Sequence, residues 1–514
     1  MSAYDELSLE LSEVSDVLNA LNLLNWDART QMPSGGASSR GQQIATLSAI
    51  AQQRLASDRL LTLLDGCETE LEGLPEDSVE RRSVAAARQA SAFYRRLSPS
   101  LTREFAALKT VAQGRWAEAR AANDFALFAP DLERVVAFSR ELAETIGYAD
   151  HPYDAMVGLY EPGMTAQRLE GLFAELRQGL LPLLRRITDS GVTPADDFLH
   201  LEYPVDSQRA FALEVAQAFG YDLTRGRLDA SLHPFEISLT RDDVRITTRY
   251  DQHFLSQALF GLLHETGHAL YEQGVDPSLA RGALTSDLMN LYAVAGTSFG
   301  AHESQSRLWE NLIGRSQPFW AHWYGRLQAH FPSQLEGVSV GAFHRAVNRV
   351  APSLIRVEAD EITYNLHIML RTELELGLMD GSLLVRDLPD AWNAKMQDYL
   401  GITPPSDSLG VLQDIHWSSG YIGSFPTYTL GNIMSCQFFE AARQQQPDLE
   451  LRLASGDYAP LRGWLTQNIY RHGRRFTPDE LLRRSTGRPL EVRPYLEYLE
   501  QKFIALYGLE RSSA

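Results

Sequence analysis

The run 254–274, FLSQALFGLLHETGHALYEQG, constrains the fold of this chain more than any other feature, because its apolar residues enclose the pattern H-E-x-x-H. The apolar flanks predict a buried helix. On a helix with 3.6 residues per turn, His264 and His268 lie on one face, one turn apart. Burying two imidazoles and the Glu265 carboxylate is costly unless these groups are paired or bind a metal. The run therefore predicts a buried helix that binds a metal ion.

The chemistry of the three side chains agrees with this interpretation. Two neutral imidazoles at this spacing bind Zn²⁺ at about 2.0–2.1 Å, and Glu265 is placed to act on a metal-bound water rather than on the metal. The structural alternative is two hydrogen-bonded helix histidines beside an exposed glutamate. With 13 His in 514 residues, the pattern is expected by chance below about 0.05 times per chain. Gly267 costs the helix about 1 kcal/mol relative to Ala, which indicates a packing or access requirement.

A catalytic zinc site keeps three protein ligands and one open position, so a third ligand must come from elsewhere. The candidates are His302 and Glu303, in the next expected helical stretch, 291–314. Adjacent helical residues point about 100° apart, so only one of them should reach the ion. The spacing of the surrounding residues leaves the choice between them open. Asp287 and Asp360 are candidates for accepting the second N–H of a metal-bound histidine, although an ordinary surface residue is the simpler interpretation of Asp287.

Most of the remaining chain predicts helices. Thr165 is a suitable N-cap for a segment whose apolar residues recur at helical spacing. The run 477–480 forms a capping box, and Gly487 is placed to end the helix that follows. Residues 101–145 contain few Gly or Pro and predict long amphipathic helices. The fold class expected is mainly α.

Strand patterns are scarce and adjacent to each other. Apolar residues alternate in HPFEISLT (233–240) and again in DVRITTRY (243–250). The Arg241-Asp242 step between the two runs predicts a β-hairpin directly before the H-E-x-x-H helix. No stretch has the composition of a long linker. Although the length suggests about three domains, we expect one unit over 1–514, with two lobes around a groove.

Composition excludes several classes of function. Lys+Arg number 47 and Asp+Glu number 66, giving a net charge of −19, which argues against nucleic-acid binding and against a polybasic membrane anchor. The acidic N-terminus has no signal-peptide pattern, and no apolar run is long enough to predict a transmembrane helix. Cys67 and Cys436 are too few for a disulfide framework and suit a reducing compartment as inert apolar residues. We therefore expect a cytoplasmic protein.

Short motifs occur in a fixed order along nearly the whole chain. They are the W-D…M-P segment in 23–33, H-P-F at 233–235, D-x-R-x-T at 243–247, H-E-x-x-H at 264–268, H-E-S-Q at 302–305, I-R-x-x-A-D at 355–360 and G-x-x-Q-D-x-H-W at 410–417. In these motifs the chain resembles the Taq-type thermostable carboxypeptidases, a family of zinc-dependent metallocarboxypeptidases.

The resemblance implies properties that spacing alone does not. It implies Glu303 as the third ligand of Zn²⁺, or of Co²⁺ as in some members. It implies a two-lobed helical ellipsoid with a deep groove and a small sheet beside the H-E-x-x-H helix, similar to neurolysin and angiotensin-converting enzyme. It also implies a homodimer that releases single amino acids, with broad side-chain tolerance, from peptides with a free C-terminus.

Peptide hydrolysis at a metal also needs a general base and stabilisation of the oxyanion. Glu265 is expected to accept the proton of the attacking water and to pass it to the leaving amine. His416 and Tyr428 are candidates for oxyanion stabilisation. The alternatives are a buried histidine beside Trp417 and a tyrosine that caps a loop.

An exopeptidase must also recognise the terminal carboxylate, which a planar arginine binds through two parallel hydrogen bonds. Arg356 is the favoured candidate, and its alternative is a structural pair with Glu358 or Asp360. Arg245 is second, because an edge strand beside the metal helix could pair with an extended peptide and bring Arg245 to it.

Two other functions compete with a carboxypeptidase. The first is a metal-dependent oligopeptidase that cuts internally or releases dipeptides. The second is a non-catalytic helical scaffold with a vestigial metal site. The intact Glu265 speaks against the second, because a structural site needs no general base and usually has four protein ligands.

Overall fold

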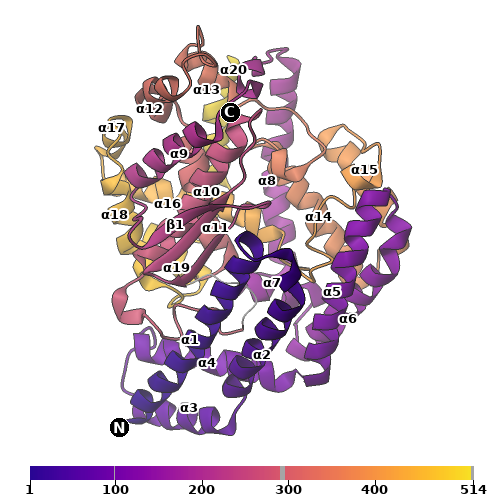
Figure 1. Cartoon of the computed structure of the whole chain (residues 1–514), viewed down its shortest axis with the longest axis vertical. Coiled ribbons are helices and arrows are strands. Elements are labelled where there is room, and N and C mark those ends of the chain that lie inside the picture. The colour runs from indigo at the N-terminus through magenta and orange to yellow at the C-terminus, as the bar shows by residue number, and fades with distance from the viewer. Residues whose placement is uncertain (98, 290–295, 511–514) are drawn as a thin grey trace. The chain divides into compact units, whose positions relative to one another are not determined.

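The computed structural model describes residues 1–97, 99–289 and 296–510, and the chain is mainly helical, as expected (Figure 1). The chain forms two compact units, each assembled from separate segments. Unit 1 comprises 1–95, 195–347 and 434–490, and unit 2 comprises 96–194, 348–433 and 491–514. The single domain over 1–514 and the groove stay predictions.

The elements of unit 1 include all of the strands. They are α1 (Ala3–Thr30), α2 (Ala37–Leu55), α3 (Asp58–Glu70), α4 (Val79–Arg96), α9 (Val205–Phe219), β1 (Gly226–Ala230), β2 (Glu236–Thr240), β3 (Asp243–Thr248), α10 (Leu255–Gly274), α11 (Phe299–Arg307), the π-helix η5 (Leu308–Gly314), α12 (Gln317–His330), α13 (Val340–Ala346), α17 (Leu449–Ala454), α18 (Ala459–Asn468) and α19 (Pro478–Thr486).

Unit 2 is helical. Its elements are α5 (Pro99–Ala122), α6 (Ala129–Ile146), α7 (Pro152–Tyr160), α8 (Ala166–Asp189), α14 (Thr363–Asp380), α15 (Leu388–Leu400) and α20 (Arg493–Tyr507), with α16 (Pro426–Gln445) beginning in unit 2 and ending in unit 1.

The helix ends follow the capping residues. The Thr165 side chain accepts a hydrogen bond from a backbone N–H in the first turn of α8. Thr477 and Glu480 form the reciprocal capping box of α19, and Gly487 ends that helix with φ 76°, in the left-handed region. The amphipathic helices expected over 101–145 are α5 and α6. These predictions from local sequence are confirmed.

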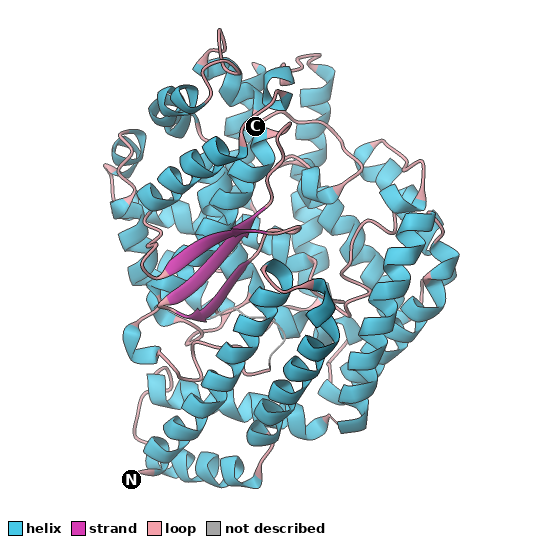
Figure 2. Cartoon of the chain, in the orientation of Figure 1, coloured by secondary structure: helices cyan, strands magenta, loops and turns pink. Residues whose placement is uncertain are grey.

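The sheet has three strands in the order β1-β3-β2 (Figure 2). The predicted hairpin is confirmed, since β2 and β3 pair antiparallel, with Ile237 opposite Arg245. The first strand, β1, was not predicted. It pairs parallel with β3, with Arg227 opposite Arg245. Its sequence, GRLDA, has charged residues where a strand usually shows apolar alternation.

Helices α1 and α10 both pack against the hairpin. The Asn22 side chain on α1 donates to the Ser238 carbonyl oxygen at 2.9 Å, and Trp26 packs with Phe235 and Ile237. The metal-motif helix α10 packs against β2 and β3. The sheet therefore supports α10 beside it.

The glycine inside α10 has a packing reason. A Cβ at Gly267 would lie 2.4 Å from the Gln305 carbonyl oxygen and 2.6 Å from the Ser306 Cα. Only glycine lets α10 and α11 approach so closely.

Helix α11 begins after its N-cap Ser298, later than expected, and the part of the expected helix over 291–295 lies outside the described residues. Helix α11 continues directly into the π-helix η5, and π-helices are rare but frequent at functional sites.

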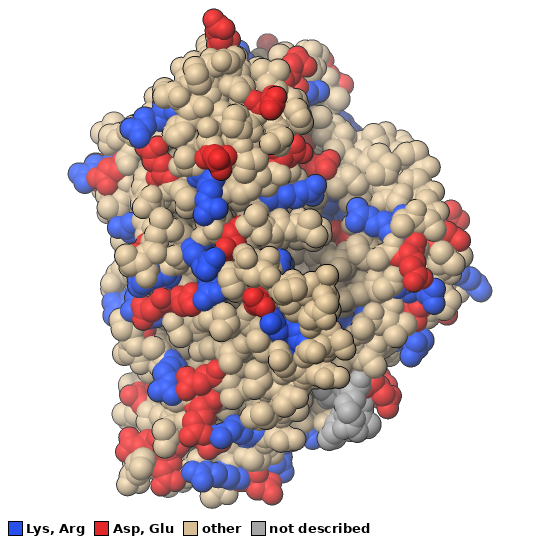
Figure 3. Space-filling model, in the orientation of Figure 1, with Lys and Arg blue, Asp and Glu red and all other residues tan. Residues whose placement is uncertain are grey.

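On the face shown in Figure 3, acidic and basic side chains are interspersed rather than gathered into one basic patch. Among the described residues, every helix is too short or too polar to cross a membrane.

Candidate metal centre

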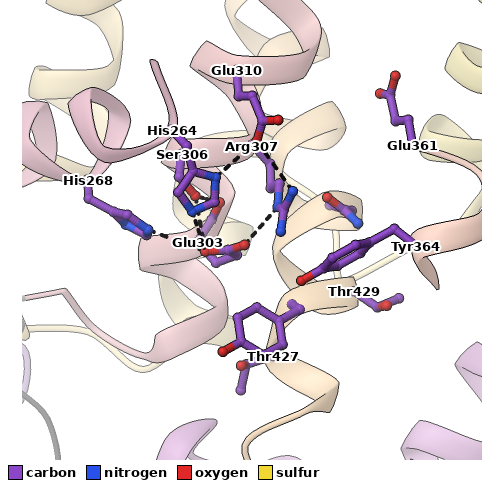
Figure 4. Close-up of polar contacts among 12 residues, drawn as sticks. His264, His268, Glu303, Ser306, Arg307, Glu310, Glu361, Tyr364, Thr427 and Thr429 are labelled. Carbon is purple, nitrogen blue, oxygen red and sulfur yellow. Dashed lines mark hydrogen bonds and ion pairs between the residues drawn. The ribbon is translucent and has the colours of Figure 1, made fainter. Parts of the chain in front are cut away.

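Two helices of unit 1 bring His264, His268 and Glu303 together, with their side chains directed toward one another (Figure 4). One carboxylate oxygen of Glu303, Oε2, lies 3.5 Å from His264 Nε2 and 3.3 Å from His268 Nε2. Two ligands of a tetrahedral ion with bonds of 2.0–2.1 Å stand about 3.3 Å apart. The donor set and its spacing therefore fit a zinc-like ion.

The charges around this set suit a cation. Burial alone would raise the pKa of Glu303, but Arg307 and the two histidines hold it well below its usual value. Burial, followed by the neighbouring His302, lowers the pKa of His268 to about 3, so its imidazole is neutral, as a ligand must be. Burial also acts to lower the pKa of His264, but Glu303 and Glu310 outweigh it and raise the value.

Each oxygen of the Glu303 carboxylate has a partner. Oε1 accepts from Arg307 Nε at 2.7 Å, one turn along α11. Oε2 accepts from the Ser306 hydroxyl at 3.1 Å and faces the two histidines. The arginine orients the carboxylate and leaves Oε2 directed at the ligand cluster.

Glu310, on η5, holds the other side of His264. Its Oε2 lies 3.0 Å from His264 Nδ1 and 3.3 Å from Arg307 Nη1, and its Oε1 accepts from Arg315 at 3.1 Å. A carboxylate in this position would orient His264 as the ligand of a metal ion.

Asp287 and Asp360 were the residues expected in this role, and for His264 that prediction is wrong. Asp287 accepts from the Met289 backbone N–H, and Asp360 in unit 2 accepts from the backbone N–H groups of Ile362 and Thr363, at the start of α14. Glu310 follows Glu303 by seven residues across the junction between α11 and η5. Seven residues are two turns at helical spacing, so the periodicity of this segment places Glu310 on the same face as Glu303 and was a signal that could have found it.

We predict that Glu310→Gln weakens Zn²⁺ binding by about 10- to 100-fold, because the amide is a weaker acceptor for the His264 N–H. The measurement is competition between the metal-free protein and a chelator of known affinity. Glu336→Gln, an exposed position in the same unit, is the matched control. An affinity equal to that of the control would contradict the role assigned to Glu310.

Glu265 follows His264 on α10 and is buried. Burial raises the pKa of its carboxyl to about 7, against the opposing effect of His264. A carboxylate with this pKa can exchange a proton near neutral pH, which suits a general base.

His302, the alternative third ligand, is engaged elsewhere. Its Nε2 lies 2.7 Å from Glu272 Oε1, and its ring stacks on that of His268. Glu303, and not His302, joins both motif histidines in one cluster.

Arg245 does not lie on an edge strand, so that prediction is wrong. Its strand, β3, is central, because β1 and β2 pair on its two sides. The guanidinium forms two hydrogen bonds of 2.8 Å with Asp243 and lies 4.3 Å from the centre of the Trp26 ring. Peptide pairing with β3 therefore cannot bring substrate to Arg245.

Arg356 belongs to unit 2 and is buried. Its Nη2 and Nε donate to Asp414 Oδ1 at 2.8 and 3.1 Å, and its Nη1 donates to the Tyr364 hydroxyl at 3.0 Å. Its carboxylate partner is therefore Asp414, rather than Glu358 or Asp360. Sequence spacing could not indicate a partner 58 residues away.

His416 and Tyr428 lie together in unit 2. Their Nε2 and hydroxyl oxygen are 3.1 Å apart, and the His416 ring stacks on Phe425 with centroids 4.4 Å apart. Burial, followed by Arg356, lowers the pKa of His416 to about 3, so the ring is neutral at physiological pH. Tyr428 lies in the first turn of α16 rather than in a loop. Unit 2 thus groups Arg356, His416 and Tyr428, and unit 1 groups the motif histidines and Glu303.

Comparison with known proteins places the chain in a family. The family model described as Carboxypeptidase Taq (M32) metallopeptidase matches residues 6–503. Thermostable carboxypeptidase 1 of Thermus thermophilus is 45% identical over 99% of this chain and 99% of its own length. Carboxypeptidase 1 of Bacillus subtilis is 39% identical over 97% of each chain.

Solved structures agree. The M32 carboxypeptidase of Deinococcus radiodurans has 42% identity and a TM-score of 0.94, covering 99% of this chain and 100% of that chain. The Pyrococcus furiosus carboxypeptidase has 34% identity and a TM-score of 0.93, covering 98% and 99%. A family of metallopeptidases implies a metal cofactor, which the His264–His268–Glu303 set could hold. This chain therefore belongs to the Carboxypeptidase Taq (M32) family of metallopeptidases.

Proposed function

We propose that this protein is a metal-dependent carboxypeptidase that releases single amino acids, with broad side-chain tolerance, from peptides with a free C-terminus. The observation that carries the proposal is the convergence of His264, His268 and Glu303 beside Glu265, in a chain whose relatives are named carboxypeptidases. Those names do not favour the oligopeptidase alternative. The proposed ion is Zn²⁺, with Co²⁺ as the second candidate.

His264, His268 and Glu303 would hold the ion, which supplies Lewis acidity for activating water and for polarising the scissile carbonyl. Glu265 accepts the proton of the attacking water. The same carboxyl then donates that proton to the nitrogen of the leaving amino acid as the C–N bond breaks. A pKa of about 7 suits both transfers.

The proposed roles of His416 and Tyr428 concern the oxyanion of the tetrahedral intermediate. The neutral His416 ring and the Tyr428 hydroxyl can each donate a hydrogen bond while staying uncharged. One such donor contributes about 3 kcal/mol of transition-state stabilisation.

Arg356 is the proposed binding group for the terminal carboxylate, and Arg245 is second. Arg356 and Arg371 share the single carboxylate of Asp414, so these three side chains carry one excess positive charge. That excess favours an incoming anion. The Arg245 guanidinium is already matched one-to-one by Asp243.

The remaining proposals concern partners and location. We place the protein in the cytoplasm, because Cys67 and Cys436 are buried and form no disulfide. The proposed homodimer rests on the resemblance to the family. A net charge of −19 disfavours nucleic acid as a partner.

The test compares two peptides of identical sequence, one with a free C-terminal carboxylate and one amidated. We expect rapid release of the last residue from the free acid and little from the amide. Activity should vanish on chelation and return with Zn²⁺ or Co²⁺, and elemental analysis should find one divalent ion per chain. Equal cleavage of both peptides would instead support the oligopeptidase.

A further inference from the structure

The two motif histidines differ in what holds them. His264 has Glu310 at its Nδ1. His268 Nδ1 is buried and has no hydrogen-bond partner among the described residues. A metal-bound histidine normally has such a partner, which fixes the plane of its ring. Among the described residues, a contact of another kind is available to fix the plane of His268.

His302 provides that contact. Its ring lies nearly parallel to that of His268, with centroids 4.5 Å apart and an interplanar angle of 12°. Aromatic rings at this separation attract each other beyond the effect of the area that they bury. His302 adjoins Glu303, so α11 delivers the proposed third ligand and the stacking ring together.

The His302 ring is itself held. Its Nε2 lies 2.7 Å from Glu272 Oε1, and both side chains are buried. The ring also stacks on Tyr271 at 5.2 Å, which in turn stacks on Tyr470 at 5.1 Å. Glu272 lies one helical turn beyond His268 on α10, so one helix carries both the ligand and the carboxylate that clamps its support.

We propose that His302 is a positioning residue that fixes the ring plane of His268 by stacking, in place of a hydrogen-bond acceptor, and that Glu272 clamps His302. The inference rests on the proposed ligand set. His268 Nε2 faces Glu303 at 3.3 Å, and free rotation of the ring would move this nitrogen away from the ion.

A second cation site is the alternative use of these groups. Glu236, Glu272 and His302 also converge, with ligand atoms within 4.8 Å of one another. However, His302 and Glu272 are only 2.7 Å apart, which is a hydrogen-bond distance and shorter than the ligand separation of about 3.3 Å around a tetrahedral ion. The contact is therefore a hydrogen bond between the two side chains.

Two matched double variants test the proposal. His302→Phe with Glu272→Leu keeps a flat ring against His268, and His302→Leu with Glu272→Leu removes it. Both lack the buried Glu272–His302 pair, so its loss affects them equally. We expect the Phe variant to bind Zn²⁺ within about threefold of wild type, and the Leu variant at least about tenfold more weakly.

Zn²⁺ affinity is measured by chelator competition, with thermal unfolding of the metal-free proteins recorded alongside. The visible spectrum of bound Co²⁺ should change only in the Leu variant. Equal Zn²⁺ affinities of the two folded double variants would overturn the proposal. It would also be overturned if the wild-type chain bound two Zn²⁺ ions and both double variants bound only one. If the wild-type protein binds no metal, the proposed function fails rather than this inference. If Glu310→Gln binds Zn²⁺ more weakly but the two double variants bind it equally, the contact at His264 matters and the stacking on His268 does not.

Discussion

The Glu265→Gln variant is expected to hydrolyse peptides about 10²- to 10⁴-fold more slowly than wild type, the range that a general base contributes. Glutamine has nearly the same shape but cannot accept the proton of the attacking water. Glu265 is not one of the converging ligands, so the metal content should stay unchanged. The measurement pairs kcat on a free-acid peptide with elemental analysis of the same sample.

Stability separates a catalytic effect from a structural one. Burial raises the pKa of Glu265 to about 7, so the folded protein disfavours its ionised form. A neutral glutamine should therefore unfold at the same temperature or higher. Glu336→Gln, at an exposed position, should leave both rate and stability unchanged. A Glu265→Gln enzyme with wild-type kcat would refute the assignment of the base.

The core of the site was predictable because it depends on one helix. The pairing of His264 with His268 follows from helical geometry as soon as the apolar run is identified. The choice between His302 and Glu303 does not, because it depends on how α11 is rotated against α10. The two helices approach each other closely at Gly267, and the spacing of residues in one helix does not show how it contacts another.

Side chains whose partners are distant in the sequence were predicted poorly. The sequence predicts an edge strand for Arg245 because β1, which pairs on the other side of β3, has no apolar alternation. Local spacing suggests Glu358 or Asp360 as the carboxylate partner of Arg356, whereas its partner is Asp414. Local patterns predict caps and helices well, and they do not report which charges meet after folding.

The assignment of segments to the two units could not be predicted from the sequence. Each is assembled from segments that alternate along the chain, so the backbone passes repeatedly from one to the other. Such passages occur through ordinary helices and short loops, α16 among them. The absence of a linker favours one domain with two lobes, which stays a prediction, and composition could not indicate where the segments divide.

Asp414→Asn is expected to lower the free energy of unfolding by about 3–5 kcal/mol, the cost of breaking a buried ion pair by removing one partner. Its Oδ1 accepts from Arg356 at 2.8 Å and its Oδ2 from Arg371 at 2.7 Å. Both arginines are buried, and an asparagine would leave their charges uncompensated. Urea unfolding of the metal-free proteins measures the loss, and Asp398→Asn, at an exposed position in unit 2, should change it by less than about 0.5 kcal/mol.

The dependence of this loss on pH distinguishes an ion pair from a packing defect. Burial alone would raise the pKa of Asp414, but Arg356 and Arg371 hold it far below its ordinary value of 3.8. A carboxyl whose pKa is lower in the folded state stabilises the protein above its unfolded pKa, and this contribution is lost as the pH falls toward the folded value. The difference between wild type and Asp414→Asn should therefore stay constant from about pH 6 to 8 and shrink only below about pH 4. A difference that stays the same in acid would show that Asp414 acts through packing rather than charge.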